Sequence, residues 1–341
     1  MSARSNRQWL LVSRPRGMPS LENFRLVERA LPALEPGQVL VRHRFLSVDP
    51  YMRGRMNEAK SYAPPQPLDQ VMGGGTVGEV LESRHQGFAA GDVVVGMGGW
   101  QEYSHAAPEA SALRRIEPRA IPLSAYLGAV GMPGVTAWYG VTRIIAPKAG
   151  ETVVVSAAAG AVGGIAGQLA RRAGAHVVGI AGGAEKCRYV TGELGFAECI
   201  DYRAHADAAA LAGALEAACP RGIDGAFENV GGLILDAVLM RANPFARIAL
   251  CGLIAGYNGE PIPLAAPQAI LVNRMRIEGF IISDHPALWP QALGELAGLV
   301  ALGQLRYRES IARGIEAAPQ ALLDLLAGRN LGKQLVELPP R

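Results

Sequence analysis

A run of small and apolar residues between positions 152 and 174 constrains the fold more than any other stretch. Its first part, TVVVSAA at 152–158, is uncharged and β-branched, which is typical of a buried strand. Its last part, AVGGIAGQLARRAG at 161–174, predicts a helix that ends at Gly174. A strand that turns within a few residues into a helix predicts a βαβ unit with a parallel sheet.

The same alternation of strand and helix continues to about residue 282. Segments that favour helices separate further predicted strands at 176–182, 198–202, 222–230, 246–252 and 276–282. With the first strand these make six, in two halves. That pattern predicts an α/β domain of the Rossmann type, with a doubly wound parallel six-stranded sheet.

The segments on either side of this region follow a different pattern. About 120 residues at the N-terminus are rich in short β-type runs, such as 38–48, 75–82 and 91–97, with glycine and proline between them. The tail beyond residue 305 no longer alternates strand and helix. We therefore expect a second, β-rich domain, to which the tail returns.

Composition limits the class of protein. A chain of 341 residues, with 50% hydrophobic and 18% charged residues, can form two domains with buried cores. Its net charge of +3, without a basic run, does not indicate a nucleic-acid partner. Two uncharged stretches, 120–142 and 152–170, have the length of a membrane span. Their prolines and glycine turn favour buried α/β core, so no membrane association is expected.

Cysteine usage bears on the compartment. The four cysteines, at 187, 199, 219 and 251, form no CxxC pair. Reduced thiols in a cytoplasmic protein are therefore the expected state. The apolar run from Trp9 to Val12 is too short for a signal peptide, which agrees with a cytoplasmic location.

The turn after the first strand reads A-A-G-A-V-G, residues 158–163, which is G-x-G-x-x-G with alanine in the first position. Gly160 would let a pyrophosphate approach the backbone, and Gly163 would let the helix pack closely on the strand. The helix N-terminus would offer N–H donors to the phosphates. The alternative is close packing of small residues without a ligand, but the strand–turn–helix context favours a dinucleotide site.

The end of the second strand bears on the choice of dinucleotide. An NAD site usually carries an acidic residue there, which binds the adenosine ribose. Here the chain reads HVVGIAGGAEK at 176–186, so Gly182 and Gly183 occupy that place and Lys186 opens the next helix. The missing carboxylate and the lysine favour a 2′-phosphate, and NADP is the predicted cofactor. Otherwise Lys186 would be an ordinary surface lysine.

Longer motifs resemble those of a known family. They are SVDPYMRGRM (47–56), GWQEY (99–103), GMPGVTAWYG (131–140), SAAAGAVGGIAGQLA (156–170), FENVGG (227–232), ALCGLIAGYN (249–258), RIEGF (276–280) and GRNLGK (328–333). The chain resembles the zinc-independent medium-chain dehydrogenase/reductases, and within them the prostaglandin reductase, 2-alkenal reductase and curcumin-reductase-like group. The resemblance implies a GroES-like catalytic β domain, residues 1–125 with 305–341, and a Rossmann NADP-binding domain, residues 126–304.

The resemblance also implies which residues bind the cofactor. Tyr202 would join Lys186 at the 2′-phosphate, and Thr136 would lie near the nicotinamide. The full implied set is Thr136, Ala159, Gly160, Ala161, Val162, Gly163, Lys186, Tyr202, Asn229, Cys251, Gly252, Tyr257, Phe280, Ile281, Ile282 and Asn330. By residue type alone, Asn229 would be a turn or cap residue, and Cys251 and Phe280 would be core residues.

No metal is expected. A catalytic zinc needs cysteine, histidine and acidic ligands, and a structural zinc lobe needs four cysteines. The chain has no cysteine before position 187, and its six histidines lack ligand spacing. This pattern disfavours a zinc alcohol dehydrogenase.

Without a metal to polarise an isolated ketone, an activated C=C bond is the more accessible substrate. Hydride from NADPH would add to the β-carbon of an α,β-unsaturated ketone or aldehyde, and charge would develop on the carbonyl oxygen. Tyr51 is the candidate donor to that oxygen, with a packed turn tyrosine as the alternative. Tyr257 is a second candidate. Some members of the family carry a functional tyrosine where this chain has Val272, so the proton donor stays open.

Two other functions stay open at this point. A quinone oxidoreductase would share the fold and cofactor, and a non-catalytic protein would bind NADPH without turnover. The apolar run RIEGFII at 276–282 predicts a late edge strand, which invites pairing with another chain. Similar proteins are often dimers, so a homodimer is expected.

Overall fold

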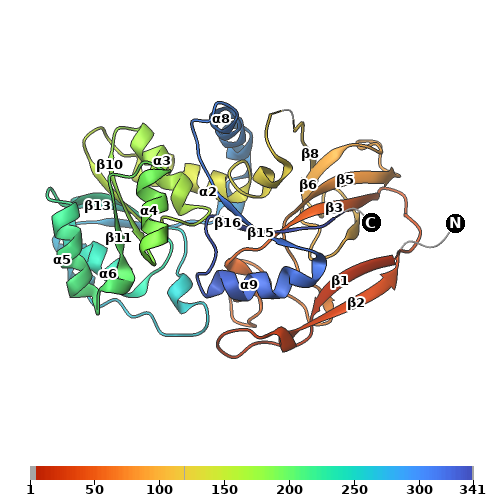
Figure 1. Cartoon of the computed structure of the whole chain (residues 1–341), viewed down its shortest axis with the longest axis horizontal. Coiled ribbons are helices and arrows are strands. Elements are labelled where there is room, and N and C mark those ends of the chain that lie inside the picture. The colour runs from red at the N-terminus through yellow and green to blue at the C-terminus, as the bar shows by residue number, and fades with distance from the viewer. Residues whose placement is uncertain (1–4, 119, 340–341) are drawn as a thin grey trace. The chain divides into compact units, whose positions relative to one another are not determined.

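The computed structural model describes residues 5–118 and 120–339, and the chain divides into two compact units (Figure 1). The first unit is drawn from Met1–Leu127 and Glu309–Arg341, and the second is Gly128–Arg308. The first unit contains two sheets and the second contains one, and each unit has its own buried cluster of apolar side chains.

A six-stranded sheet in the order β11-β10-β9-β12-β13-β14 forms the centre of the second unit. Every neighbouring pair in it is parallel. This is the strand order of a doubly wound dinucleotide-binding sheet, so the predicted α/β fold class is confirmed. The strands are β9 (Thr152–Ser156), β10 (His176–Ala181), β11 (Glu198–Asp201), β12 (Ile223–Glu228), β13 (Ala242–Leu250) and β14 (Arg276–Gly279).

Helices cover the sheet of the second unit. They are α2 (Met132–Tyr139), α3 (Gly163–Arg172), α4 (Ala184–Gly192), α5 (Ala208–Ala218), α6 (Gly232–Arg241), α7 (Pro267–Val272) and α8 (Trp289–Ala301). Helices α5 and α6 pack on each other and bury alternate strand residues, among them Val154 and Val178. All five residues of β9 are buried, which explains why this strand is uncharged. Among the described residues, no helix has both the length and the apolar character of a membrane span.

Several predicted elements extend beyond those in the structure, and helix α3 and strand β14 show two reasons for this. Helix α3 ends at Arg172 rather than Gly174, because Gly174 adopts a left-handed φ of 89° that terminates the helix. Strand β14 ends at Gly279 rather than at residue 282. Phe280 leaves the strand, and its ring packs with Tyr139 and Phe227.

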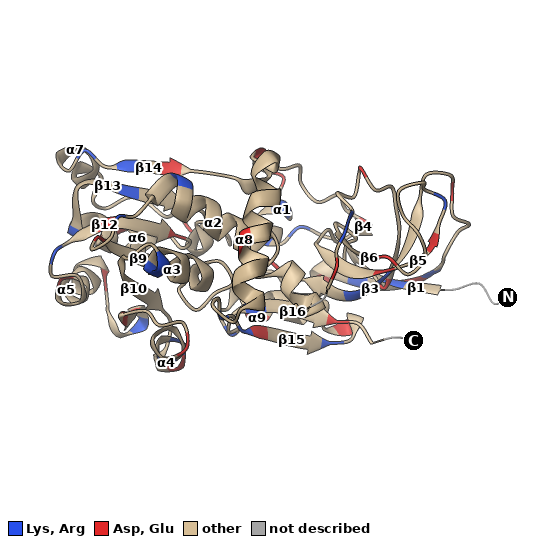
Figure 2. Cartoon of the chain, turned by 90° about the horizontal axis from the view of Figure 1, so that it is seen from above, with Lys and Arg blue, Asp and Glu red and all other residues tan. Residues whose placement is uncertain are grey.

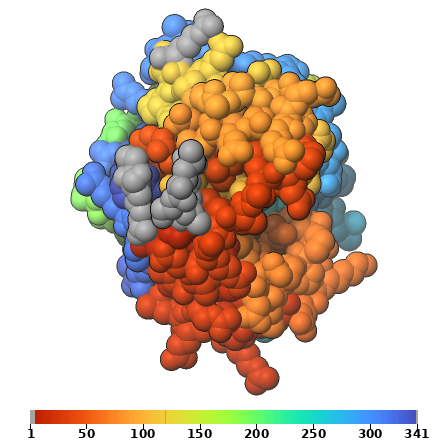
Figure 3. Space-filling view, turned by 90° about the vertical axis from the view of Figure 1, so that its right-hand side faces the viewer, coloured from red at the N-terminus to blue at the C-terminus, as the bar shows by residue number. Residues whose placement is uncertain are grey.

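The first unit is built from two sheets. One has the order β2-β1-β4, and the other has the order β15-β16-β3-β5-β6-β8, with β7 paired to β3. The strands are β1 (Ser5–Leu11), β2 (Phe24–Ala30), β3 (Val39–Ser47), β4 (Gln70–Val71), β5 (Thr76–Ser83), β6 (Val93–Gly96), β7 (Tyr103–Ala106), β8 (Arg114–Arg115), β15 (Glu309–Arg313) and β16 (Lys333–Glu337). Residues from the N-terminal part of this unit, in red and orange, make up most of the face in Figure 3.

The C-terminal segment joins the first unit through hydrogen bonds to strand β3. Strand β16 pairs antiparallel with β3, with Leu335 opposite Ser47. Helix α9 (Ala318–Leu326) adds Leu322 to a core that also contains Met52 and Trp100. Residues from both ends of the chain therefore surround α1 (Tyr51–Arg55).

Candidate functional site

The glycine turn of the second unit lies between β9 and α3. Ala157 has a left-handed φ of 47°, and the N–H of Gly160 donates to the carbonyl of Ala157 at 2.8 Å. A Cβ at Gly163 would overlap that same carbonyl oxygen. Gly163 therefore allows the first turn of α3 to pack against the strand end. The N-terminus of this ten-residue helix faces the turn, as an anion-binding helix does.

A basic cluster surrounds the next turn, between β10 and α4. A Cβ at Gly182 would lie only 2.9 Å from both the Arg203 and Tyr202 side chains, so glycine allows these side chains to approach the backbone. Burial lowers the pKa of Lys186, and the nearby positive charge of Arg203 lowers it further. Two cationic side chains are thus held close together, an arrangement that suits a phosphate dianion.

Sequence reasoning missed Arg203 and Asp201 at this turn. The carboxylate of Asp201 accepts the backbone N–H groups of Gly183 at 2.8 Å and Arg203 at 3.0 Å. Both residues flank Tyr202 at the end of β11, so the only sequence signal was their position after the third strand. A carboxylate is therefore present near the turn, but backbone donors occupy it.

Glu228 ends strand β12 and is almost completely buried, with 1% of its surface exposed. Its carboxylate accepts the N–H groups of Val230 and Gly231, each at 2.7 Å. Burial raises the pKa of Glu228 to about 7, although these hydrogen bonds oppose the shift. Sequence reasoning missed this residue, whose one signal is that it is the second of two acids, after Asp224, in the otherwise uncharged run GIDGAFENV.

The side chain of Asn229 connects two strand ends. Its Nδ2 donates to the carbonyl of Ser156 at 2.8 Å, and its backbone N–H donates to the Ser156 hydroxyl at 2.7 Å. The N–H of Cys251 donates to the carbonyl of Glu228 at 2.8 Å. Burial raises the pKa of the Cys251 thiol to about 12. The ends of β9, β12 and β13 are therefore held together by direct hydrogen bonds.

Tyr257 folds back over the segment that follows β13. A Cβ at Gly252 would lie 3.2 Å from the Tyr257 hydroxyl. Burial raises the pKa of Tyr257, and a hydrogen bond with the backbone at Leu253 opposes the shift. The phenol therefore lies at the carboxyl edge of the sheet in its neutral form.

Phe280 and Thr136 face other residues of the second unit. Phe280 is 9% exposed and packs 5.3 Å from the Tyr139 ring, centroid to centroid. The Thr136 hydroxyl donates to the carbonyl of Met132 within α2, at 2.7 Å. Ile281 is half-buried, and Ile282 is buried at the start of a 3-10 turn. The side chains of Phe280 and Thr136 thus have structural partners.

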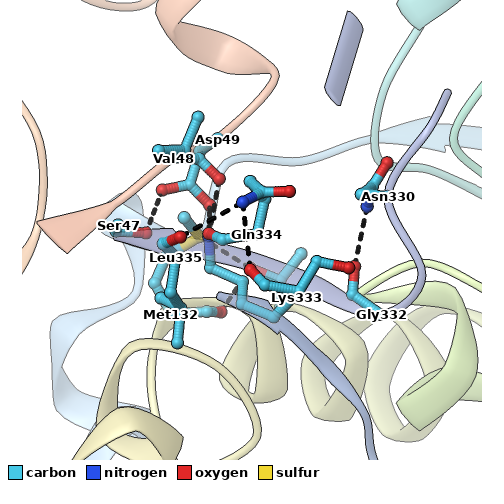
Figure 4. A network of polar contacts seen from close by, with 11 residues as sticks. Ser47, Val48, Asp49, Met132, Asn330, Gly332, Lys333, Gln334 and Leu335 are labelled. Carbon is cyan, nitrogen blue, oxygen red and sulfur yellow. Dashed lines mark hydrogen bonds and ion pairs between the residues drawn. The ribbon is translucent and has the colours of Figure 1, made fainter. Parts of the chain in front are cut away.

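Two predicted site residues belong to the first unit. Tyr51 is half-buried at the start of α1, and its ring packs on the core that contains Met52. Burial raises the pKa of Tyr51 above its ordinary value, and the charge of Asp49 raises it further. Asn330 donates through Nδ2 to the carbonyl of Gly332 at 2.8 Å (Figure 4).

The predicted residues of the second unit gather at one edge of its sheet. Because all six strands are parallel, residues that follow their carboxyl ends share that edge. The turn Ala159–Gly163, Lys186, Tyr202, Asn229, Cys251, Gly252 and Phe280 all do so. Val272 instead lies in α7 and is 65% exposed. In the described ranges, no group of three or more His, Cys, Asp or Glu residues is arranged to hold a metal ion.

A doubly wound sheet with a glycine turn and basic side chains at the next turn is typical of dinucleotide-dependent oxidoreductases. Residues 7–115 match a family model described as the N-terminal domain of oxidoreductase. Residues 161–298 match one described as zinc-binding dehydrogenase. The chain belongs to the medium-chain dehydrogenase/reductase family, as its motifs indicate.

Similar proteins span nearly the whole chain. The NADPH-dependent curcumin reductase of Escherichia coli is 44% identical, over 98% of this chain and 97% of its own. The NADP(+)-dependent 2-alkenal reductase of Nicotiana tabacum is 40% identical, over 97% of both chains. The crystal structure of CurA from Vibrio vulnificus in complex with NADPH has a TM-score of 0.91 at 42% identity, covering 98% of this chain and all of its own (100%).

Proposed function

We propose that this protein uses NADPH to reduce the activated C=C bond of α,β-unsaturated ketones and aldehydes, with hydride added to the β-carbon. The basic cluster of Lys186 and Arg203 carries the cofactor assignment, because it offers two cations beside a turn whose nearby carboxylate is already hydrogen-bonded. The names of the similar reductases support the choice of substrate class.

The residues of this chain would bind and orient the reactants. Lys186, Arg203 and Tyr202 would hold the 2′-phosphate, and the turn before α3 would hold the pyrophosphate. Thr136, the strand ends from Asn229 to Ile282, and Asn330 would complete the cofactor site. When bound, the reduced nicotinamide supplies the hydride.

Tyr51 would donate a hydrogen bond to the carbonyl oxygen as charge develops on it. Its raised pKa keeps the phenol protonated, so it acts as a donor and not as a base. Tyr257, also neutral, would contact substrate. With Val272 in place of the tyrosine of some relatives, solvent would supply the proton to the α-carbon.

We also propose that the protein is a cytoplasmic homodimer. Strand β14 is an edge strand of its sheet and lies beside β13, and α7 connects these two strands in the chain (Figure 2). Phe245, Leu271 and Val272 are 63%, 80% and 65% exposed in the same part of the chain. An open strand edge with exposed apolar residues beside it favours pairing with a second copy.

The decisive experiment measures NADPH oxidation across a panel of enals, enones and quinones, with deuteride-labelled cofactor. We expect enals and enones to be reduced fastest, with deuterium at the β-carbon of the product. Faster turnover of quinones would assign the protein as a quinone reductase. Tight NADPH binding without turnover of any substrate would make it a non-catalytic binding protein.

A further inference from the structure

Lys333 is a charged residue in the core of the first unit, with 3% of its surface exposed. Its ammonium donates to the carbonyls of Val48 at 2.6 Å and Gln334 at 2.8 Å, and it lies 3.1 Å from Asp49 Oδ1 (Figure 4). An ammonium has three N–H donors, and these contacts use all three. The side chain therefore has one defined position.

Asp49 is equally buried, at 4% exposure, and is held from both sides. The Ser47 hydroxyl donates to its other carboxylate oxygen. The carbonyl of Asp49 accepts the N–H of Met52 at 3.1 Å and so begins the turn of α1. Tyr51 follows Asp49 by two residues, across Pro50, whose φ is −59°. The contacts that fix the backbone at Val48 and Asp49 therefore also fix the backbone position from which the Tyr51 side chain extends.

A second carboxylate lies on the adjacent strand, because Glu309 of β15 is the register partner of Lys333 in β16. Glu309 raises the pKa of Lys333, while burial of the ammonium lowers it more strongly. Burial raises the pKa of Glu309, and its Oε1 is buried without a hydrogen-bond partner among the described residues. The Lys333–Asp49 ion pair therefore lies before the start of α1, and a second carboxylate stands on the adjacent strand.

A buried ion pair is a poor way to increase stability, since well-packed apolar residues often do as well or better. Its directional bonds do fix geometry. We propose that Lys333 is a positioning residue, which holds the Val48–Asp49 turn so that the Tyr51 hydroxyl is correctly placed for the reaction. This inference rests on the proposed function, because it acts through Tyr51.

The test is a double-mutant cycle on turnover of an enone. Lys333→Met should lower kcat by about 10- to 100-fold, because small displacements of a catalytic group are costly. It should leave the Kd for NADPH unchanged. Adding Tyr51→Phe to Lys333→Met should then cost little, although Tyr51→Phe alone costs much. Equal costs of Tyr51→Phe in both backgrounds would overturn the inference.

Amide hydrogen exchange over residues 48–56 provides a readout besides activity. We expect faster exchange there in Lys333→Met, and unchanged exchange would contradict the inference. If that variant does not fold, the double variant Lys333→Met with Asp49→Asn removes both charges of the ion pair. We expect it to fold and to have a low kcat. A kcat equal to that of the wild type would refute the positioning role of Lys333. Arg313→Met is the matched control. It removes an exposed ion pair, Arg313–Glu337, which joins β15 to β16, the strand that also contains Lys333. If no enone is reduced by the wild type, the proposed function fails, and exchange alone decides the positioning role.

Discussion

The carboxylate of Asp201 accepts the backbone N–H of Gly183 at 2.8 Å, which ties the end of β11 to the turn after β10. The chain therefore has an acid one strand further on than the NAD fingerprint places it. Because backbone N–H groups occupy this carboxylate, it is not free to bind the hydroxyls of a ribose. Lys186 and Arg203 add two positive charges at the turn, and Glu185 in the first turn of α4 adds one negative charge.

Lys186→Ala should weaken NADPH binding and leave NADH binding nearly unchanged. A hydrogen bond to a charged group contributes roughly 1.5–3 kcal/mol, which corresponds to a loss of about one to two orders of magnitude in affinity. Arg203→Ala should act in the same way. Binding can be measured by the fluorescence of the reduced cofactors. Arg188→Ala, on the exposed side of α4, is the control. Equal losses for NADPH and NADH would remove Lys186 from the 2′-phosphate site.

Tyr51→Phe should lower kcat for a simple enone by roughly 10–100-fold. Loss of one oxyanion donor typically costs about 10²–10³ in turnover. Water or a ribose hydroxyl can replace part of it. The Kd for NADPH should not change, and kcat and kcat/KM should fall together. A larger kinetic isotope effect with deuterated NADPH is expected in the variant. Full turnover would make Tyr51 a packing residue.

Glu228 should make the free energy of unfolding depend on pH. Its pKa of about 7 lies above the ordinary value of 4.5, so the folded state binds the proton more tightly than the unfolded chain. The stability that Glu228 contributes is fully present below pH 4.5 and is lost as pH rises through 7, by roughly 3 kcal/mol. Urea unfolding of wild type and Glu228→Gln at pH 5 and 8 measures this loss. A constant difference between the two proteins would contradict the prediction.

Prolonged chelation should leave activity intact. The prediction rests on the absence of cysteine before position 187 and of ligand spacing among the histidines. Activity is compared before and after dialysis against a chelator, with elemental analysis of the same samples. One zinc per chain, lost together with activity, would reverse the assignment.

Light scattering at micromolar concentration should give the mass of a dimer. Leu271→Glu, at an 80% exposed position in α7, should shift the mass toward the monomer by placing charge beside the β14 edge. Leu302→Glu changes a leucine of similar exposure, 71%, after α8 and should remain dimeric. A monomeric wild type would refute the proposed assembly.

The parallel sheet and the glycine turn were predictable because they depend on local patterns. An uncharged β-branched strand is buried on both faces, and a small-residue turn leads directly into a helix. Gly163 illustrates this: the need for close packing on Ala157 involves residues only six positions apart.

The contact between Lys333 and Asp49 could not be predicted from the sequence, because 284 positions separate them. The motifs that contain these two residues do not indicate which residues they contact. The antiparallel pairing of β16 with β3 places them together in a buried site. Arg203 and Glu228 were missed for a related reason. The order of residues along a strand does not predict which backbone donors or charged side chains of another loop will contact that strand. For Glu228, burial in the folded protein is what raises the pKa to about 7.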